Sequence, residues 1–256
     1  MAAIKYAIWD SCTMSKRCII TSFRKVDTLV TNLLVPVGML MLFVFVFSGV
    51  MDVGEYNFVN FIIPGIIMQT IGQSAGVTAI VISEDVTKGL FSRFRSMPIN
   101  KAAPMTGHVV AATFRNMFST TLTIIIALLL GFRPEANFSQ WLIIAGVLVM
   151  YILAITWFST ICGIIAKSAE TGAAMTLLAA VLPYFSSGFV PVESMGPVLQ
   201  VFARHQPMTP VIDTVRALSL GMPPGDSLFL ALVWCTGIIV TSYIIVTYLY
   251  QRRLSA

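Results

Sequence analysis

Charged side chains are scarce in this sequence. Only 11% of the 256 residues are Asp, Glu, Lys or Arg and 57% are hydrophobic, whereas a typical soluble domain is about one-quarter charged. This scarcity excludes an ordinary water-soluble domain and indicates a chain surrounded by lipid. The net charge of +5 does not indicate nucleic-acid binding, because the basic residues lie beside apolar runs and act there as topology signals.

The sequence also has few residues suited to metal binding or nucleophilic catalysis. Its cysteines show no CxxC spacing and are Cys12, Cys18, Cys162 and Cys235. We therefore expect neither a zinc site nor a disulfide framework. A phosphate-binding loop, an HExxH motif and a nucleophile elbow are all missing from the sequence, so the chain is not predicted to hydrolyse ATP alone.

Six apolar runs approach the roughly 20 residues that a helix needs to cross a bilayer. They are 29–51, 58–82, 105–132, 141–166, 172–189 and 228–250. The sequence therefore predicts an all-α integral membrane protein with six transmembrane helices in a single transmembrane domain, 1–256. Pro36 and Pro64 fall inside the first two runs, where a proline removes a backbone donor and can kink the helix.

Basic residues predict the orientation of these spans. With both termini in the cytoplasm, every Lys and Arg lies on the cytoplasmic side except Arg133, Arg204 and Arg216. The opposite orientation would break the positive-inside bias. In the favoured topology His108 and His205 lie on opposite sides of the membrane, so they cannot share a metal ion.

Residues 1–25 carry basic residues beside a partial apolar stripe that includes Ile4, Ile8, Cys18 and Ile19. This pattern predicts a helix lying on the membrane surface, with a disordered basic leader as the alternative. The apolar run that follows is too long for a cleaved signal peptide. We expect an uncleaved spanning helix there.

The second cytoplasmic segment, 84–98, has three apolar residues at helical spacing: Leu90, Phe91 and Phe94. Basic residues surround them at Lys88, Arg93 and Arg95. The pattern predicts a short amphipathic helix that ends before Pro98 and docks on a partner. An ordinary solvated loop is the alternative.

Polar residues inside the spans are candidates for a translocation path. Gln69, Gln73 and Thr78 lie in the second span and Arg115 in the third. The two glutamine amides either line a polar route or, more commonly, hydrogen-bond to a neighbouring helix. We expect Arg115 to extend to the inner interface, and contact with an anionic head group is the alternative.

Two segments before the sixth run, 172–180 and 186–225, predict close helix packing and short helices that dip into the outer leaflet, respectively. Small residues in 172–180 favour close helix approach, including one at a subunit interface. Segment 186–225 is too apolar for a solvated loop, and its two apolar clusters predict two short helices in the outer leaflet. Asp213 and Arg216, at i and i+3, are interpreted as a structural pair.

Three stretches, 58–66, 84–98 and 185–221, carry a family resemblance. The first resembles the Pro-Gly opening of the second span in type-2 ABC exporters, especially the daunorubicin-resistance exporters of bacteria. The second resembles the acidic, Gly-containing, Arg-rich coupling loop of that family. The third resembles its extracellular re-entrant signature, and the similarity extends over nearly the whole chain.

The resemblance implies a permease that exports a hydrophobic or amphipathic compound, such as a drug, an antibiotic or a lipid, across the bacterial inner membrane. It also implies a homo- or heterodimer of membrane subunits with two cytoplasmic ABC ATPase subunits. Those ATPases would use ATP and Mg²⁺, while this chain would bind no cofactor, metal or nucleic acid.

The same resemblance assigns roles to residues. ATPase coupling is expected at Glu84, Asp85, Lys88, Gly89, Leu90, Phe91, Arg93, Phe94 and Arg95. The extracellular gate is expected at Gly188, Pro191, Asp213 and Arg216.

Two other classes of function remain open from the residues alone. A lipid-modifying intramembrane enzyme could use Glu84, Asp85 and His108, although these residues lack the spacing of a metal or nucleophile site. An ion-driven carrier needs a carboxylate near mid-membrane. No Asp or Glu lies near the centre of any predicted span.

Overall fold

The computed structural model describes residues 13–20, 26–47, 57–89 and 103–255. Helices dominate these ranges and no strand occurs within them, which confirms the all-α class. The elements are α2 (Val26–Leu42), the π-helix η1 (Phe43–Phe47), α3 (Phe58–Thr87), α5 (Ala103–Leu129), α6 (Phe138–Ile165), α7 (Ala169–Val181), the 3₁₀ helices η2 (Leu182–Phe185) and η3 (Val192–Ser194), α8 (Pro197–His205), α9 (Met208–Ser219) and α10 (Asp226–Ser255). Of the predicted surface helix 1–25, only 13–20 are described, and they are helical.

Four described helices are long and apolar enough to cross a membrane. They are Phe58–Thr87, Met105–Leu129, Phe138–Ile165 and Asp226–Leu249. The predicted first and fifth spans correspond to shorter apolar helices, Leu34–Phe47 and Ala169–Phe185. The fifth prediction, 172–189, runs too far, because Pro183 lacks the N–H that would continue α7 and the chain tightens into η2 instead.

Side chains and glycine define several helix ends. Asn57 caps α3 by accepting a 3.0 Å hydrogen bond from the Val59 N–H, and Asn137 with Gln140 forms a capping box on α6. After Thr87 the chain turns at Gly89, whose φ of +67° suits glycine. Glu84 and Asp85 therefore belong to the last turn of α3. The predicted coupling segment 84–98 therefore starts inside α3, and its residues 90–98 lie outside the described residues.

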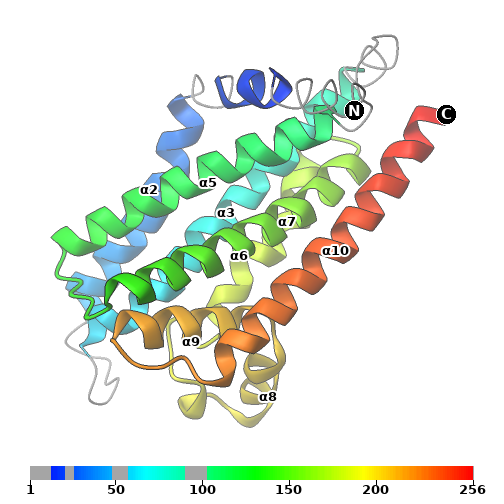
Figure 1. Cartoon of the computed structure of the whole chain (residues 1–256). Coiled ribbons are helices and arrows are strands. Elements are labelled where there is room, and N and C mark those ends of the chain that lie inside the picture. Colours follow the sequence, from blue (N-terminus) through cyan, green and yellow to red (C-terminus); the bar gives the residue numbers. More distant parts are fainter. Residues whose placement is uncertain (1–12, 21–25, 48–56, 90–102, 256) are drawn as a thin grey trace.

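The helices form one bundle with two distinct ends (Figure 1). The end of α3, the start of α5, the α6–α7 connection and the end of α10 lie together at one end. Helices α8 and α9 close the opposite end. Lys88 and Lys167 thus lie at one end, and Arg133, Arg204 and Arg216 lie in elements at the other.

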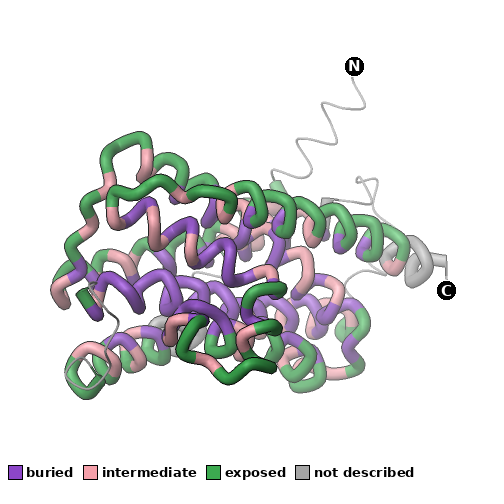
Figure 2. Tube along the Cα trace, turned by 90° about the horizontal axis from the view of Figure 1, so that it is seen from below, coloured by how far each residue is buried: buried purple, intermediate pink, exposed green. Residues whose placement is uncertain are grey.

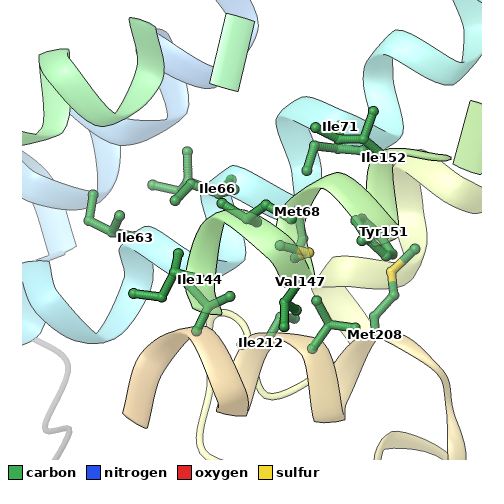
Figure 3. Close-up of a cluster of buried hydrophobic side chains, with 14 of the residues drawn as sticks. Ile63, Ile66, Met68, Ile71, Ile144, Val147, Tyr151, Ile152, Met208 and Ile212 are labelled. Carbon is green, nitrogen blue, oxygen red and sulfur yellow. The ribbon is translucent and has the colours of Figure 1, made fainter. Parts of the chain in front are cut away.

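Helix α3 occupies the interior of the bundle. It packs against α2, α5, α6, α7 and α9, and Figure 2 shows the buried stretches gathered inside while exposed residues follow the outer helices. Close to α9, isoleucines and Met68 of α3 meet Ile144, Val147 and Tyr151 of α6 (Figure 3). Met208 and Ile212 of α9 close this cluster from below, so α9 is part of the core rather than a surface loop.

Candidate functional site

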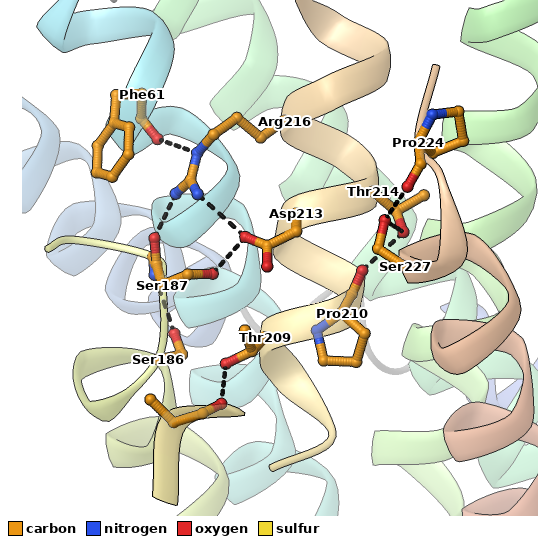
Figure 4. A network of polar contacts seen from close by, with 12 residues as sticks. Phe61, Ser186, Ser187, Thr209, Pro210, Asp213, Thr214, Arg216, Pro224 and Ser227 are labelled. Carbon is orange, nitrogen blue, oxygen red and sulfur yellow. Dashed lines mark hydrogen bonds and ion pairs between the residues drawn. The ribbon is translucent and has the colours of Figure 1, made fainter. Parts of the chain in front are cut away.

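Arg216 holds three elements together at the α8–α9 end (Figure 4). From α9 its Nε donates to the Phe61 carbonyl of α3 at 3.2 Å, and its guanidinium lies 3.9 Å from the Phe61 ring centroid. A further guanidinium N–H donates to the Ser187 carbonyl. This geometry needs the planar, multi-donor guanidinium of arginine.

Asp213 completes the network from the same helix. Its carboxylate lies 3.1 Å from an Arg216 nitrogen and accepts a 2.6 Å hydrogen bond from the Ser187 hydroxyl. Burial raises the pKa of Asp213, while the Ser187 hydrogen bond and the Arg216 charge act in the opposite direction. The interpretation of Asp213 and Arg216 as a structural pair agrees with this geometry.

The predicted gate residues are only partly brought together. Gly188 directly follows Ser187 and so lies beside the Asp213–Arg216 pair. Pro191 instead directly precedes η3, so it is not part of the same hydrogen-bonded network. Sequence reasoning missed Phe61 and Ser187, because nothing in the sequence links a backbone carbonyl of the second span to a residue about 150 positions later.

Two glycines allow α3 to contact other backbone closely. A Cβ at Gly65 would lie 2.4 Å from the carbonyl oxygen of Gly188, and one at Gly72 would lie 2.3 Å from that of Ala179 in α7. Both distances are too short for any side chain. Small residues of α7 were predicted to permit close helix approach. At Ala179 this close approach occurs within the chain, between α7 and α3.

Helix α9 is anchored to its other neighbours by polar contacts. The Thr214 hydroxyl lies 3.0 Å from Ser227 at the start of α10. The Ser219 carbonyl accepts from the Glu135 N–H of the α5–α6 turn at 2.9 Å. Gln206, between α8 and α9, donates to the Phe185 carbonyl at 2.6 Å, so the whole α8–α9 segment is tied to the bundle.

Helices α3 and α5 are joined by polar links along their antiparallel contact. At one end, Asp85 Oδ2 lies 3.0 Å from His108 Nε2. Further along, Arg115 donates to the Thr78 hydroxyl at 2.7 Å. At the other end, Asn60 exchanges two hydrogen bonds with the Arg133 backbone at 3.0 and 3.2 Å. From one link to the next, the number of residues along α3 equals the number along α5 and the turn after it. The three links are therefore compatible with a single antiparallel register of the two helices.

The predicted ATPase-coupling residues are described only in part. Glu84 and Lys88 form an exposed 2.9 Å ion pair, and Asp85 is half-buried against His108. The hydrogen bond that Lys88 donates to the Glu84 carboxylate raises the pKa of Lys88. Gly89 forms the turn, and Leu90, Phe91, Arg93, Phe94 and Arg95 lie outside the described residues.

The candidate translocation residues do not share one side of α3. The Gln69 amide is fully buried and donates to the Tyr184 hydroxyl of η2, whereas Thr78 meets Arg115 of α5. Gln69 and Thr78 are separated by nine positions, which places them on opposite faces of a helix. Gln73 is half-buried. Side-chain hydrogen bonds of Gln69, Thr78 and Arg115 therefore join α3 to other helices.

Arg115 differs from its prediction. Instead of extending to the inner interface, its side chain is turned toward α3 and is only 3% exposed. In the described part of the chain no carboxylate lies within ion-pair distance of it.

Metal-binding chemistry finds no support in the described ranges. Cys18, Cys162 and Cys235 are free thiols there, and no cluster of three His, Cys, Asp or Glu residues is suited to a metal ion. Asp85 and His108 meet as a pair without a third ligand.

A bundle of apolar helices with helix-to-helix polar links and an end closed by two short helices is typical of a multi-pass membrane protein. The sequence model of the ABC-2 type transporter family matches residues 11–220. The chain belongs to this family. It is therefore the membrane subunit of an ABC transporter and works with ATPase activity located in partner subunits.

Two bacterial relatives agree with this membership. The chain is 25% identical over 227 residues to the daunorubicin resistance ABC transporter permease protein DrrB1 of Streptomyces coeruleorubidus, covering 88% of this chain and 80% of that protein. It is also 25% identical over 201 residues to the probable doxorubicin resistance ABC transporter permease protein DrrC of Mycobacterium tuberculosis, covering 78% and 71% respectively.

Proposed function

We propose that this chain is one of two permease subunits in an ATP-driven exporter that moves a hydrophobic or amphipathic compound out of a bacterial cell. The family membership carries the proposal, and the names of the two relatives support a drug or a comparable amphiphile as cargo. The second permease is either an identical or a related chain. Two cytoplasmic ATPases supply the ATP and Mg²⁺ chemistry.

The proposed topology has six spans with both termini in the cytoplasm of a cell whose inner membrane holds the complex. Helices α2 with η1 and α7 with η2 serve as the two additional spans. Placing Lys88 and Lys167 inside and the α8–α9 end outside agrees with the positive-inside bias. Exposed apolar residues of α8, such as Val198 and Val201, then face the outer leaflet.

Coupling to the ATPases is proposed for segment 84–98, which connects α3 to α5. Apolar residues there dock in a groove of the ATPase, with basic residues at its rim. Displacement of the segment moves α3 and α5 together, because Asp85–His108 and Thr78–Arg115 link them. The Phe61–Arg216 contact then extends this motion to α9 and the outer gate.

A charge-reversal experiment tests this coupling. Full complexes carrying Arg93→Glu with Arg95→Glu should still hydrolyse ATP but lose export, measured as ATP-driven uptake of a fluorescent amphiphile into inverted vesicles. Lys167→Glu, at the same end of the bundle, is the matched control and should retain efflux. Efflux that follows the proton gradient rather than ATP, or that needs no ATPase, would contradict the proposal.

A further inference from the structure

Arg115 lies in a buried polar region to which the described residues supply no counter-charge. Its side chain is 3% exposed, its Nε has no hydrogen-bond partner, and its one described acceptor is the neutral Thr78 hydroxyl. A cation removed from water without an anionic partner is strongly unfavourable. The arrangement therefore indicates a missing acceptor-bearing group.

The next residue of α5 shows the same deficit. Asn116 is 1% exposed, and neither its amide oxygen nor its amide nitrogen has a partner. One turn further on, the buried Thr120 hydroxyl is also unsatisfied. Buried polar atoms are normally hydrogen-bonded, so several such atoms within 115–120 indicate a ligand-binding region rather than simple helix packing.

The depth of Arg115 limits what the ligand can be. Asp85, near the C-terminal end of α3, contacts His108 of α5. Arg115 lies seven residues farther along α5, which is roughly 10 Å deeper at the α-helical rise. A resting lipid keeps its head group at the membrane surface. A head group reaches this depth only while it is being moved across.

We infer that Arg115 and Asn116 form a binding site for the anionic head group, phosphate or carboxylate, of an amphipathic molecule during its passage. This inference rests on the proposed export function and specifies the class of cargo. Arg115 supplies the charge and directional N–H donors, and the Asn116 amide supplies a further donor and acceptor. Thr78 orients the guanidinium from α3.

Binding of dodecyl phosphate tests the site directly. The full chain, purified in dodecyl maltoside, is titrated with dodecyl phosphate while its thermal unfolding is followed. We expect a saturable upward shift in wild type, and Arg115→Gln should weaken the apparent affinity roughly tenfold or more, as expected for loss of a charged hydrogen bond. Arg115→Lys should retain part of the response.

Two controls separate binding from packing and from surface charge. Thr78→Val removes the hydrogen bond that orients the guanidinium but keeps the cation, so the affinity should fall less than in Arg115→Gln. Lys167→Gln removes an exposed charge and should leave the response unchanged. If Arg115→Gln does not fold, Asn116→Leu, which keeps the charge, should reduce the affinity on its own.

Several results would overturn the inference. They are an unchanged response in Arg115→Gln, an equal loss in Lys167→Gln, or an equal shift from inorganic phosphate, which would make the site one for free anions. ATPase co-purification and ATP-driven export are measured on the same variants. If they persist without a dodecyl phosphate response, the head-group site is wrong and the export function stands.

Discussion

Single residues at the α8–α9 end of the bundle have roles that their type alone explains. Gly65 is required because α3 and the Gly188 backbone meet with no room for a Cβ. Arg216 is required because its planar fork reaches a helix carbonyl, a loop carbonyl and a carboxylate together. Changes at these positions test geometry rather than polarity.

Gly65→Ala should destabilise the protein by about 1–3 kcal/mol, since the new methyl group collides with the Gly188 carbonyl and the backbones must separate. Thermal unfolding in detergent measures the effect. Gly146→Ala in α6 is the control, because a Cβ there meets nothing within 4 Å. Equal effects in the two variants would mean that the α3 contact is unimportant.

Arg216→Lys should lower stability and ATP-driven efflux although it keeps the charge. Lysine cannot stack on Phe61 and donate to its carbonyl while also reaching Ser187 and Asp213, and losing such bonds costs about 1–3 kcal/mol. Arg204→Lys on α8, where the arginine is exposed, should behave as wild type. Retention of both properties in Arg216→Lys would show that charge alone suffices.

At the scale of elements, α3 is bound differently on its different sides. Glycines bring it against α7 and the Gly188 segment, and hydrogen bonds distributed along its length join it to α5. The two kinds of contact have different consequences. Backbone contact fixes distance, whereas the polar links to α5 fix the sliding register.

A double-mutant cycle on Asp85→Asn and His108→Gln tests the register. The two residues should show an interaction energy of about 0.5–3 kcal/mol in thermal or denaturant unfolding, and each single variant should reduce the coupling of ATP hydrolysis to efflux. Glu84→Gln removes only an exposed pair with Lys88 and should have no measurable effect on stability. Additive effects of the first two changes would mean that the observed pair does not lock the helices.

At the scale of the whole molecule, the two ends of the bundle differ in what they offer a partner. One end brings together the end of α3, the start of α5 and the end of α10, and the other is closed by α8 and α9. The proposed ATPase-coupling segment and the proposed gate belong to opposite ends of this bundle.

Cysteine labelling tests the orientation. In intact cells, Ser139→Cys at the start of α6 should react with a membrane-impermeant maleimide, because it lies exposed at the α8–α9 end. Glu170→Cys at the start of α7 should react only after permeabilisation. Reversed reactivity would invert the topology, and the unmodified chain reports the background from its native cysteines.

Hydrophobic runs and charge bias were sufficient to predict the helical class, the positions of the long helices and the two short helices α8 and α9. Helix ends were less predictable. For example, α3 continues through Asp85, where a contact with His108 of α5 that the sequence does not reveal supports the last turn. The partners of Arg216 and Arg115 could not be predicted. They depend on tertiary contacts, and sequence spacing carries no information about which face of α3 each helix covers.

The enclosure of α3 also has a consequence for biosynthesis. Its apolar window has a mean hydropathy of 1.4, below the 2.3 of α6, and 72% of that window is covered by other parts of the chain. Two of its polar residues, Gln69 and Thr78, find hydrogen-bond partners in η2 and α5, which leave the ribosome later. A nascent chain that ends soon after α3 should therefore be held by the insertion machinery, and release into lipid should follow only when its later neighbours have been synthesised.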